Sequence, residues 1–364
     1  MKKLVIIGAN SFQNKLILKA KSLGYETHVF AWGCGDVGEK TADVFYPVSI
    51  IEKEKILEIS REIQPDGVCT IASDLAAITV NYVAEKLGLT CNPPEIMEPC
   101  TNKYAMRKCF LDAGIPSPQF VKTDSVNDRV KAMAFPLIVK PTDRSGSRSI
   151  TKVYEKKGLQ NAIDRAVRES FENMAIVEEY IAGDEYSLES ISYRGEHHFL
   201  AITKKYTTGE PHFIETGHVQ PADLTPETEK EVEKVIFSAL DALGVQNGAG
   251  HAEFRVDEKG NVRIIEIGAR MGGDCIGSDL VQLSTGYDFV KMVIDVACGK
   301  KPDFTKGETV ERAEIRFLFG EEDLQELKQI QKENPNRIHF VSEIEKSDAV
   351  QDSSTRWGYY ILID

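Results

Sequence analysis

Long apolar runs, cysteine pairs and a surplus of basic residues are all missing from this sequence of 364 residues. No apolar run reaches the ~20 residues that a membrane-spanning helix needs. The opening stretch MKKLVIIGANSFQNK has polar residues where a signal peptide would stay apolar. We therefore expect a cytoplasmic protein that does not associate with a membrane.

The spacing of the cysteines and the net charge argue against further classes of protein. The seven cysteines are scattered and never form a C-x-x-C pair, which argues against a disulfide framework or a zinc site and favours buried, inert thiols. The 57 acidic and 44 basic residues give a net charge of −13, so no nucleic-acid partner is expected. An anionic ligand would have to meet a local cluster of cations.

Alternating strand and helix patterns fill the first 95 residues. An apolar run ends at Gly8-Ala9 and is followed by a helical pattern over 12–23. The later strand patterns lie at 26–32 and 66–71, and the later helical patterns at 52–63 and 76–87. This order predicts a parallel, doubly wound, Rossmann-like sheet over residues 1–95.

A dinucleotide site is disfavoured in that sheet. Gly8-Ala9-Asn10 lacks the later glycines that let a backbone approach a pyrophosphate, and no acidic residue ends the second strand. Asp74 follows the third predicted strand, at the edge where open sheets bind ligands. We keep Asp74 as a candidate substrate contact, although a helix N-cap at Ser73-Asp74 is the stronger interpretation.

The remaining chain predicts an α+β body in which strands dominate. Its helical patterns lie at 159–170, 226–243, 278–297 and 321–333. An earlier helix is capped by Thr101 or Asn102 and carries Lys103 in its first turn. A helix N-terminus attracts anions, so an anion beside Lys103 would be stabilised twice. A solvated surface lysine is the alternative.

A phosphate lid is predicted around Lys140. A strand over 135–141 ends at this lysine, and a polar loop then leads into the next strand. Ser145, Gly146 and Ser147 offer N–H groups and hydroxyls to phosphate oxygens above the charge of Lys140. An ordinary turn, which many loops of this composition form, is the alternative.

The segment 251–270 predicts a β-hairpin that turns at Lys259-Gly260. The paired positions are then Glu253 with Glu266, Arg255 with Ile264, and His251 with Gly268. By the two-residue period, His251 and Arg270 share the face of the two glutamates. The other face is apolar except for Arg263 and comprises Ala252, Phe254, Val256, Ile265 and Ile267.

Two opposed carboxylates repel each other unless one is protonated or both share a cation. Oxygen ligands alone favour Mg²⁺ or Mn²⁺ over zinc. Glu253 and Glu266 are therefore the predicted metal ligands, and a solvated acidic hairpin is the alternative.

Taken in order, these segments resemble the ATP-grasp superfamily over about residues 1–300. The resemblance implies a mixed α/β and α+β fold with a Rossmann-like domain (1–95), an ATP-grasp domain (96–300) whose lid subdomain spans about 115–185, and a C-terminal subdomain (301–364). It implies ATP and Mg²⁺ or Mn²⁺ as cofactors. The implied nucleotide contacts are Lys103, Lys140, Ser145, Gly146 and Ser147 for phosphate, Glu178, Glu179, Tyr180 and Ile181 for the base, and Glu185 for the ribose.

A closer resemblance is to bacterial L-amino acid ligases, on Glu215-x-x-His218 together with Glu253, Glu266 and Arg270. It implies that a small carboxylate, such as an amino acid, becomes an acyl phosphate and then joins an amine. Arg270 would stabilise the acyl phosphate, Glu215 would meet a substrate ammonium, and His218 would lie beside the reacting carboxyl. His251 is a further candidate catalytic residue.

Two departures keep alternatives open. Gly268 stands where many relatives carry a metal-binding asparagine, which favours an ATP sensor without turnover as one alternative. The single Gly146 differs from the glycine-rich lid of biotin carboxylase relatives. A ligase that uses a thiol or bicarbonate is another alternative. The sequence names neither the acid nor the amine, and it leaves a homodimer open.

Overall fold

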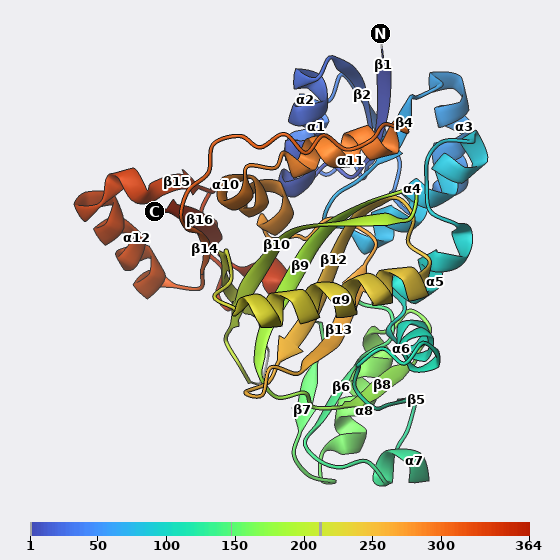
Figure 1. Ribbon diagram of the computed structural model, residues 1–364, viewed down its shortest axis with the longest axis vertical. Helices are drawn as coiled ribbons and strands as arrows, with labels where there is room; N and C mark the ends of the chain where they lie inside the picture. The colour runs from blue at the N-terminus through green and yellow to red at the C-terminus, as the bar shows by residue number, and fades with distance from the viewer. Residues whose placement is uncertain (1, 147, 211–212) are drawn as a thin grey trace.

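The structure is a computed structural model that describes residues 2–146, 148–210 and 213–364 (Figure 1). Its described strands form three sheets, of four, eight and four strands. The N-terminal four-stranded sheet lies at one end of the molecule. The other four-stranded sheet, within residues 120–179 and named the lid sheet, lies at the opposite end, and the eight-stranded sheet lies between them (Figure 1). No helix of the described residues is long and apolar enough to span a membrane.

The N-terminal sheet is parallel, as predicted, and has the order β3-β2-β1-β4. Its elements are β1 (Lys2–Ile7), α1 (Ser11–Ser22), β2 (Tyr25–Ala31), α2 (Val37–Thr41), β3 (Val44–Pro47), α3 (Lys53–Ile63), β4 (Gly67–Cys69) and α4 (Asp74–Leu87). The sequence patterns missed α2 and β3. Both are short, and β3 is a half-exposed edge strand without the buried apolar run of β1.

Short helices connect this sheet to the lid. They are η1 (Pro94–Ile96), α5 (Met97–Thr101) and α6 (Lys103–Asp112). Asn102 caps α6, because its side chain accepts hydrogen bonds from the amides of Tyr104 and Ala105. Lys103 therefore begins the helix, as the sequence predicted.

The lid sheet is antiparallel, with the order β5-β8-β6-β7. It comprises β5 (Phe120–Thr123), α7 (Asp128–Lys131), β6 (Leu137–Pro141), β7 (Thr151–Val153), α8 (Leu159–Glu169) and β8 (Ala175–Glu179). Buried side chains of α8, Ala162, Ile163 and Ala166, lie in one core cluster with Val139 of β6 and Val177 of β8. The lid thus has a small core of its own.

The central sheet has the order β13-β12-β9-β10-β11-β14-β16-β15. Its elements are β9 (Asp184–Tyr193), β10 (Glu196–Thr207), β11 (Glu215–Gln220), α9 (Pro226–Leu243), β12 (Gly248–Val256), β13 (Val262–Gly268), β14 (Ala313–Leu318), α12 (Glu321–Glu333), η3 (Pro335–Arg337), β15 (Ile338–Val341), η4 (Ser353–Thr355) and β16 (Gly358–Ile363). Strands after residue 300 continue this sheet through the pairing of β14 with β11. The domain boundaries drawn from the sequence stay predictions.

The predicted long helix over 278–297 is wrong. The chain instead forms η2 (Ile276–Leu280), α10 (Val281–Thr285) and α11 (Phe289–Ala297). Gly286 follows α10 with a φ of 77°, a left-handed conformation that ends a helix and that glycine adopts without steric cost.

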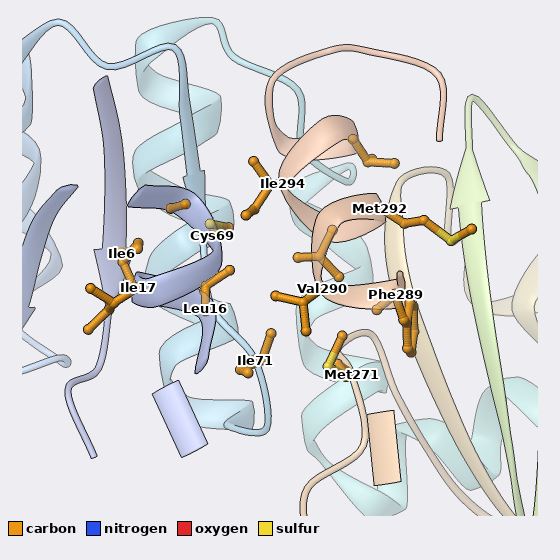
Figure 2. Packing of buried hydrophobic residues seen from close by; sticks show 14 of the residues in the cluster. Ile6, Leu16, Ile17, Cys69, Ile71, Met271, Phe289, Val290, Met292 and Ile294 are labelled. Carbon is orange, nitrogen blue, oxygen red and sulfur yellow. The ribbon is translucent and has the colours of Figure 1, made fainter. Parts of the chain in front are cut away.

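Helix α11 joins the N-terminal sheet to the central sheet. Figure 2 shows Val290 and Ile294 of α11 facing Leu16 of α1 and Ile71 after β4. The same buried cluster includes Ile191 and Ala249 from the central sheet. This shared core fixes the strand ends of the N-terminal sheet beside the central sheet.

The 251–270 hairpin forms with the predicted pairs His251–Gly268 and Glu253–Glu266, but its register then shifts. Phe254 lies opposite Ile264, which leaves Ile265 as an extra, unpaired residue of β13. The predicted pairing of Arg255 with Ile264 is therefore wrong.

The bulge reverses the two faces of β13 between Ile265 and the turn. Ile264 and Val262 enter the core, whereas Arg263 is exposed. Ile265, predicted on the core face, instead lines the cleft described below. A single inserted residue does this because side chains alternate between faces along a strand.

Candidate active site

A cleft of about 1110 Å³ of empty space opens between the lid sheet and the β12–β13 hairpin. Most of the predicted site residues line it: Lys103, Lys140, Ser145, Gly146, Glu178, Glu179, Tyr180, Ile181, Glu185, Glu215, His251, Glu253, Glu266 and Arg270. Ser147 lies outside the described residues. Asp74 lines a neighbouring cleft that shares Lys103, Arg144 and Glu266 with the first. His218 is buried beside Asp274 rather than on the cleft wall.

Lys140 belongs to a buried cluster of three charges. Its Nζ lies 2.7 Å from Oε2 of Glu178, and Nε of Arg107 lies 2.7 Å from Oε1 of the same carboxylate. Burial lowers the pKa of Lys140, and Glu178 opposes that shift. Two cations share one carboxylate, so the cluster keeps one surplus positive charge for an anion in the cleft.

Arg107 was missed in the sequence. It lies four residues after Lys103, and positions four apart share one helix face, which is the signal that could have revealed it. Glu178, expected at the adenine base, directs its carboxylate to Arg107 and Lys140. Its predicted contact with the base is not tested by this geometry and stays a prediction.

Lys103 lies where the first turn of α6 meets the hairpin. Its Nζ donates to Oε1 of Glu266 at 2.9 Å and to the carbonyl oxygen of Arg144 at 2.7 Å. The lysine is 5% exposed, so the alternative of a solvated surface residue is wrong. The lid loop and the predicted metal ligand Glu266 are thus tied to one cation.

Arg255 organises the predicted adenine and ribose contacts. Its Nη1 donates to the hydroxyl of Tyr180 at 3.0 Å and to the carbonyl oxygen of Ile181 at 2.9 Å, and its Nη2 donates to Glu185 at 2.8 Å. Gly183 allows this segment to pass close to the backbone of β12, because a Cβ there would lie 2.2 Å from the carbonyl oxygen of Val256. Arg255 shares the strand face of Glu253, a spacing that could have revealed its role.

Glu179 lies at the outer end of this segment. Its carboxylate forms an ion pair with Arg263, which the bulge has turned out of the core. Nζ of Lys152 lies 3.6 Å from the centroid of the Tyr180 ring. Lys152, at the ring, and Arg255, at the hydroxyl, thus hold the Tyr180 side chain in place.

Glu253 and Glu266 lie directly opposite each other on β12 and β13. Glu253 forms an ion pair with Lys205 of β10, which also lies 3.5 Å from Oε1 of Glu185. Burial by itself would raise the pKa of Glu253, but Lys205 and His251 hold it well below its usual range. Lys205 is 6% exposed and was assigned no role from the sequence.

The two glutamates fit a hard divalent cation as a partial ligand set. Both line the cleft, both offer oxygen donors, and each is paired with one lysine. Among the described residues no group of three or more His, Cys, Asp or Glu side chains converges on one point. Mg²⁺ bound here would therefore take its remaining ligands from phosphate oxygens and water, which is its usual mode of binding.

His251 lies beneath Glu253. Its Nδ1 contacts Glu189, and its Nε2 lies 3.4 Å from Oε1 of Glu253. Glu189 also accepts a hydrogen bond from the amide of Gly272 at 2.9 Å. Burial would lower the pKa of His251, but Glu189 and Glu253 raise it above the usual value. The imidazole thus supports a predicted metal ligand, and its catalytic role stays a prediction.

Arg270 and Asp74 form an ion pair between the hairpin and the N-terminal sheet. Nε of Arg270 donates to Oδ1 of Asp74 at 2.7 Å. Ser73 caps α4 by accepting a hydrogen bond from Ala76, which confirms the N-cap interpretation. Gly268 underlies the pair, since a Cβ there would lie 3.2 Å from both Nε of Arg270 and Oδ1 of Asp74.

A further cluster lies around Glu215. The hydroxyl of Ser353 donates to its Oε2 at 2.8 Å. Nε2 of His218 lies 3.6 Å from Oδ2 of Asp274, which forms a two-pronged ion pair with Arg356. No sequence pattern predicted a role for Asp274, Ser353 or Arg356. Only the tertiary structure brings these three segments together.

Comparison with known proteins identifies the architecture. Residues 133–279 match the family described as the ATP-grasp domain. The crystal structure of L-amino acid ligase from Bacillus licheniformis superposes with a TM-score of 0.83 and 26% identity, over 100% of this chain and 93% of that one. Phosphoribosylglycinamide synthetase from Anaerococcus prevotii has the same fold, with a TM-score of 0.78 at 19% identity, over 100% of this chain and 94% of that one.

A curated relative is alanine–anticapsin ligase of Bacillus subtilis (strain 168), 26% identical over 280 residues. That alignment covers 70% of this chain and 58% of the relative. The chain thus spans less than two thirds of the relative's length. The predicted ATP-grasp fold and the resemblance to carboxylate–amine ligases are confirmed.

Proposed function

We propose that this chain, which has the ATP-grasp fold, is an ATP-dependent ligase that joins an amino acid or a similar small acid to an amine. One observation carries the proposal. Two buried lysines, two opposed glutamates and an arginine from distant segments converge on one cleft. That set neutralises the charge of a nucleotide polyphosphate and of a second anion beside it.

Nucleotide binding is the first part of the proposal. Tyr180 and Ile181 provide the wall for the base, and Glu185 is available to the ribose once Arg255 has fixed its position. Lys103 and Lys140 face the phosphates, and the surplus charge beside Glu178 favours an anion there. Glu253 and Glu266 would hold Mg²⁺, which would neutralise charge on the transferred phosphoryl group.

Acid activation follows. A carboxylate oxygen of the acid attacks the γ-phosphorus, the bond from that phosphorus to the β–γ bridging oxygen breaks, and ADP leaves. Arg270 stands at the same wall as Glu266, so its guanidinium can stabilise the carboxylate and then the acyl phosphate. Its ion pair with Asp74 fixes the position of the guanidinium.

Amide formation completes the reaction. The neutral amine attacks the acyl carbon, the carbon–oxygen bond to phosphate breaks, and phosphate leaves with the bonding electrons while the nitrogen loses one proton. Glu215 is a lining carboxylate whose side chain is met by the hydroxyl of Ser353. We propose that it receives the ammonium of an amino acid substrate, because a carboxylate in a partly enclosed site favours a cationic partner.

The test is a screen of purified protein with ATP, Mg²⁺ and pairs of amino acids and amines, with phosphate release and new product masses both recorded. Phosphate release together with an amide mass supports the ligase. Release that requires a thiol or bicarbonate identifies one of the other ligase classes. Tight ATP binding without turnover for any pair argues for a sensor.

Two further proposals concern the location of the protein and its oligomeric state. We propose a cytoplasmic location, in line with the composition of the chain, and localisation of a tagged full-length protein tests it. The homodimer is a proposal for which light scattering of the purified protein is the direct test.

A further inference from the structure

Arg356 connects three segments that are far apart in the chain. Its Nη1 and Nη2 donate to the two carboxylate oxygens of Asp274 at 2.9 and 2.6 Å. Its Nε donates to the carbonyl oxygen of Ser353 at 2.8 Å, and Nη1 also reaches the carbonyl oxygen of Glu215 at 3.4 Å. One guanidinium thus holds the loop after β13, the C-terminal segment and the start of β11.

The guanidinium is packed as well as hydrogen-bonded. Its carbon lies 3.6 Å from the centroid of the Phe317 ring, and its side chain is 7% exposed. Phe317 also contacts His218 edge-on. A planar, two-pronged cation stacked on a ring is a rigid arrangement that lysine cannot reproduce.

The loop that Arg356 holds is conformationally strained. Asp274 and Cys275 have φ values of 51° and 60°, and neither is glycine. Left-handed backbone is sterically unfavourable for a residue that carries a Cβ. The ion pair to Asp274 offsets that cost, so the loop depends on Arg356 to keep this shape.

Both ends of the predicted amino acid site depend on this arrangement. Arg270 begins the strained loop and lines the cleft, and Glu215 lines the cleft at the start of β11. Ser353, whose carbonyl accepts from Arg356, turns its hydroxyl to Glu215. Movement of Arg356 would therefore disturb both charged residues together.

We propose that Arg356 is the positioning residue for substrate in this cleft. It fixes Glu215 and the Arg270 loop so that they receive the ammonium and the carboxylate of one zwitterionic amino acid. The inference rests on the proposed ligase function and deepens it. It also gives the region after residue 300 a part in substrate binding, although Arg356 itself does not touch the reacting atoms.

The chain offers a matched control in Arg337. Like Arg356, this arginine lies after residue 300 and pairs with an aspartate, Asp364. Its side chain is 37% exposed, and it is not among the residues that line the described clefts. Loss of an exposed pair has little effect on stability.

The experiment compares Arg356→Met, Arg356→Lys and Arg337→Met with the wild type, using ATP, Mg²⁺ and a panel of the proteinogenic L-amino acids. Arg356→Met should raise the KM for the preferred amino acid by about tenfold or more, because small displacements of binding groups are costly. The KM for ATP should stay within about twofold. Arg356→Lys should recover part of the loss, and Arg337→Met should match the wild type.

The other outcomes are distinct. An unchanged amino acid KM in Arg356→Met, or an equal rise in the KM values for ATP and amino acid, overturns the inference. A wild type that never forms ADP overturns the proposed function instead. In that case calorimetric binding of the same amino acids to the protein with ADP and Mg²⁺ decides the inference: weaker binding in Arg356→Met supports it, and equal binding or no binding in the wild type rejects it.

Discussion

Glu253 and Glu266 lie directly opposite each other on neighbouring antiparallel strands, and each is paired with a different buried lysine. Lys205 reaches Glu253 from β10, and Lys103 reaches Glu266 from the start of α6. The two lysines therefore offset the repulsion that two carboxylates at opposite ladder positions would otherwise feel. The arrangement supplies a pair of oxygen donors on the wall of the cleft.

Replacing either glutamate should abolish most turnover. We expect Glu253→Gln and Glu266→Gln each to lower kcat by about 100-fold or more, because a neutral amide binds Mg²⁺ more weakly than a carboxylate. ADP formation and calorimetric Mg²⁺ titration measure the two effects. Glu326→Gln is the matched control, since that carboxylate pairs with Arg316 at the surface. Retention of normal turnover in Glu253→Gln would contradict the ligase and favour a sensor.

Replacing Glu178 and replacing its neighbour Glu179 should have very different effects on the stability of the protein. Glu178→Leu leaves Arg107 and Lys140 buried without their shared partner. The free energy of unfolding measured in urea should therefore fall by about 3–5 kcal/mol. Glu179→Leu removes only a half-exposed pair with Arg263 and should cost about 1 kcal/mol or less. Similar losses for the two variants would show that the Arg107–Glu178–Lys140 cluster does not stabilise the fold.

Gly268 should not tolerate a side chain. Gly268→Ala places a Cβ 3.2 Å from Nε of Arg270, so the arginine must shift. We expect kcat to fall by about tenfold or more while the Kd for ATP changes little. Gly307→Ala is the control, because the nearest atom to its added Cβ is 3.7 Å away. Wild-type kcat in Gly268→Ala would show that the placement of Arg270 over Gly268 is not required.

The Asp274–Arg356 pair predicts a specific pH dependence of stability. Burial would raise the pKa of Asp274, but Arg356 and His218 hold it below its ordinary value of 3.8. A carboxyl with a depressed pKa contributes stability above its unfolded pKa and loses it as pH falls through the folded pKa. The free energy of unfolding of Asp274→Asn should therefore be about 3 kcal/mol below that of the wild type at both pH 7 and pH 5. The difference should shrink only below about pH 3.8.

Urea unfolding at pH 7, 5 and 3.5 measures that difference. If the gap in unfolding free energy between wild type and Asp274→Asn already narrows between pH 7 and pH 5, a titrating group other than Asp274 controls the pair. Asp364→Asn, which leaves the exposed Arg337 without a partner, serves as the control for a surface ion pair.

Local sequence patterns were enough to predict the main elements and several side-chain neighbours. Helix α9 spans Pro226–Leu243 and α12 spans Glu321–Glu333, as their periodicity predicted. Asn102 caps α6, and Glu253 pairs with Glu266. These features depend on residues close together in the chain, where hydrophobic period, capping and a single turn are enough to fix the geometry.

The partners that complete the site come from distant segments and depend on the packing of the folded chain. Lys205 meets Glu253 from another strand, Arg356 meets Asp274 from the C-terminal region, and Arg107 shares Glu178 with Lys140. The bulge at Ile265 is another feature that the local patterns did not predict. Its one unpaired residue reverses which face of β13 meets the core. Contacts between distant segments depend on how sheets and loops pack against one another, and the local periodicity of the sequence does not contain that information.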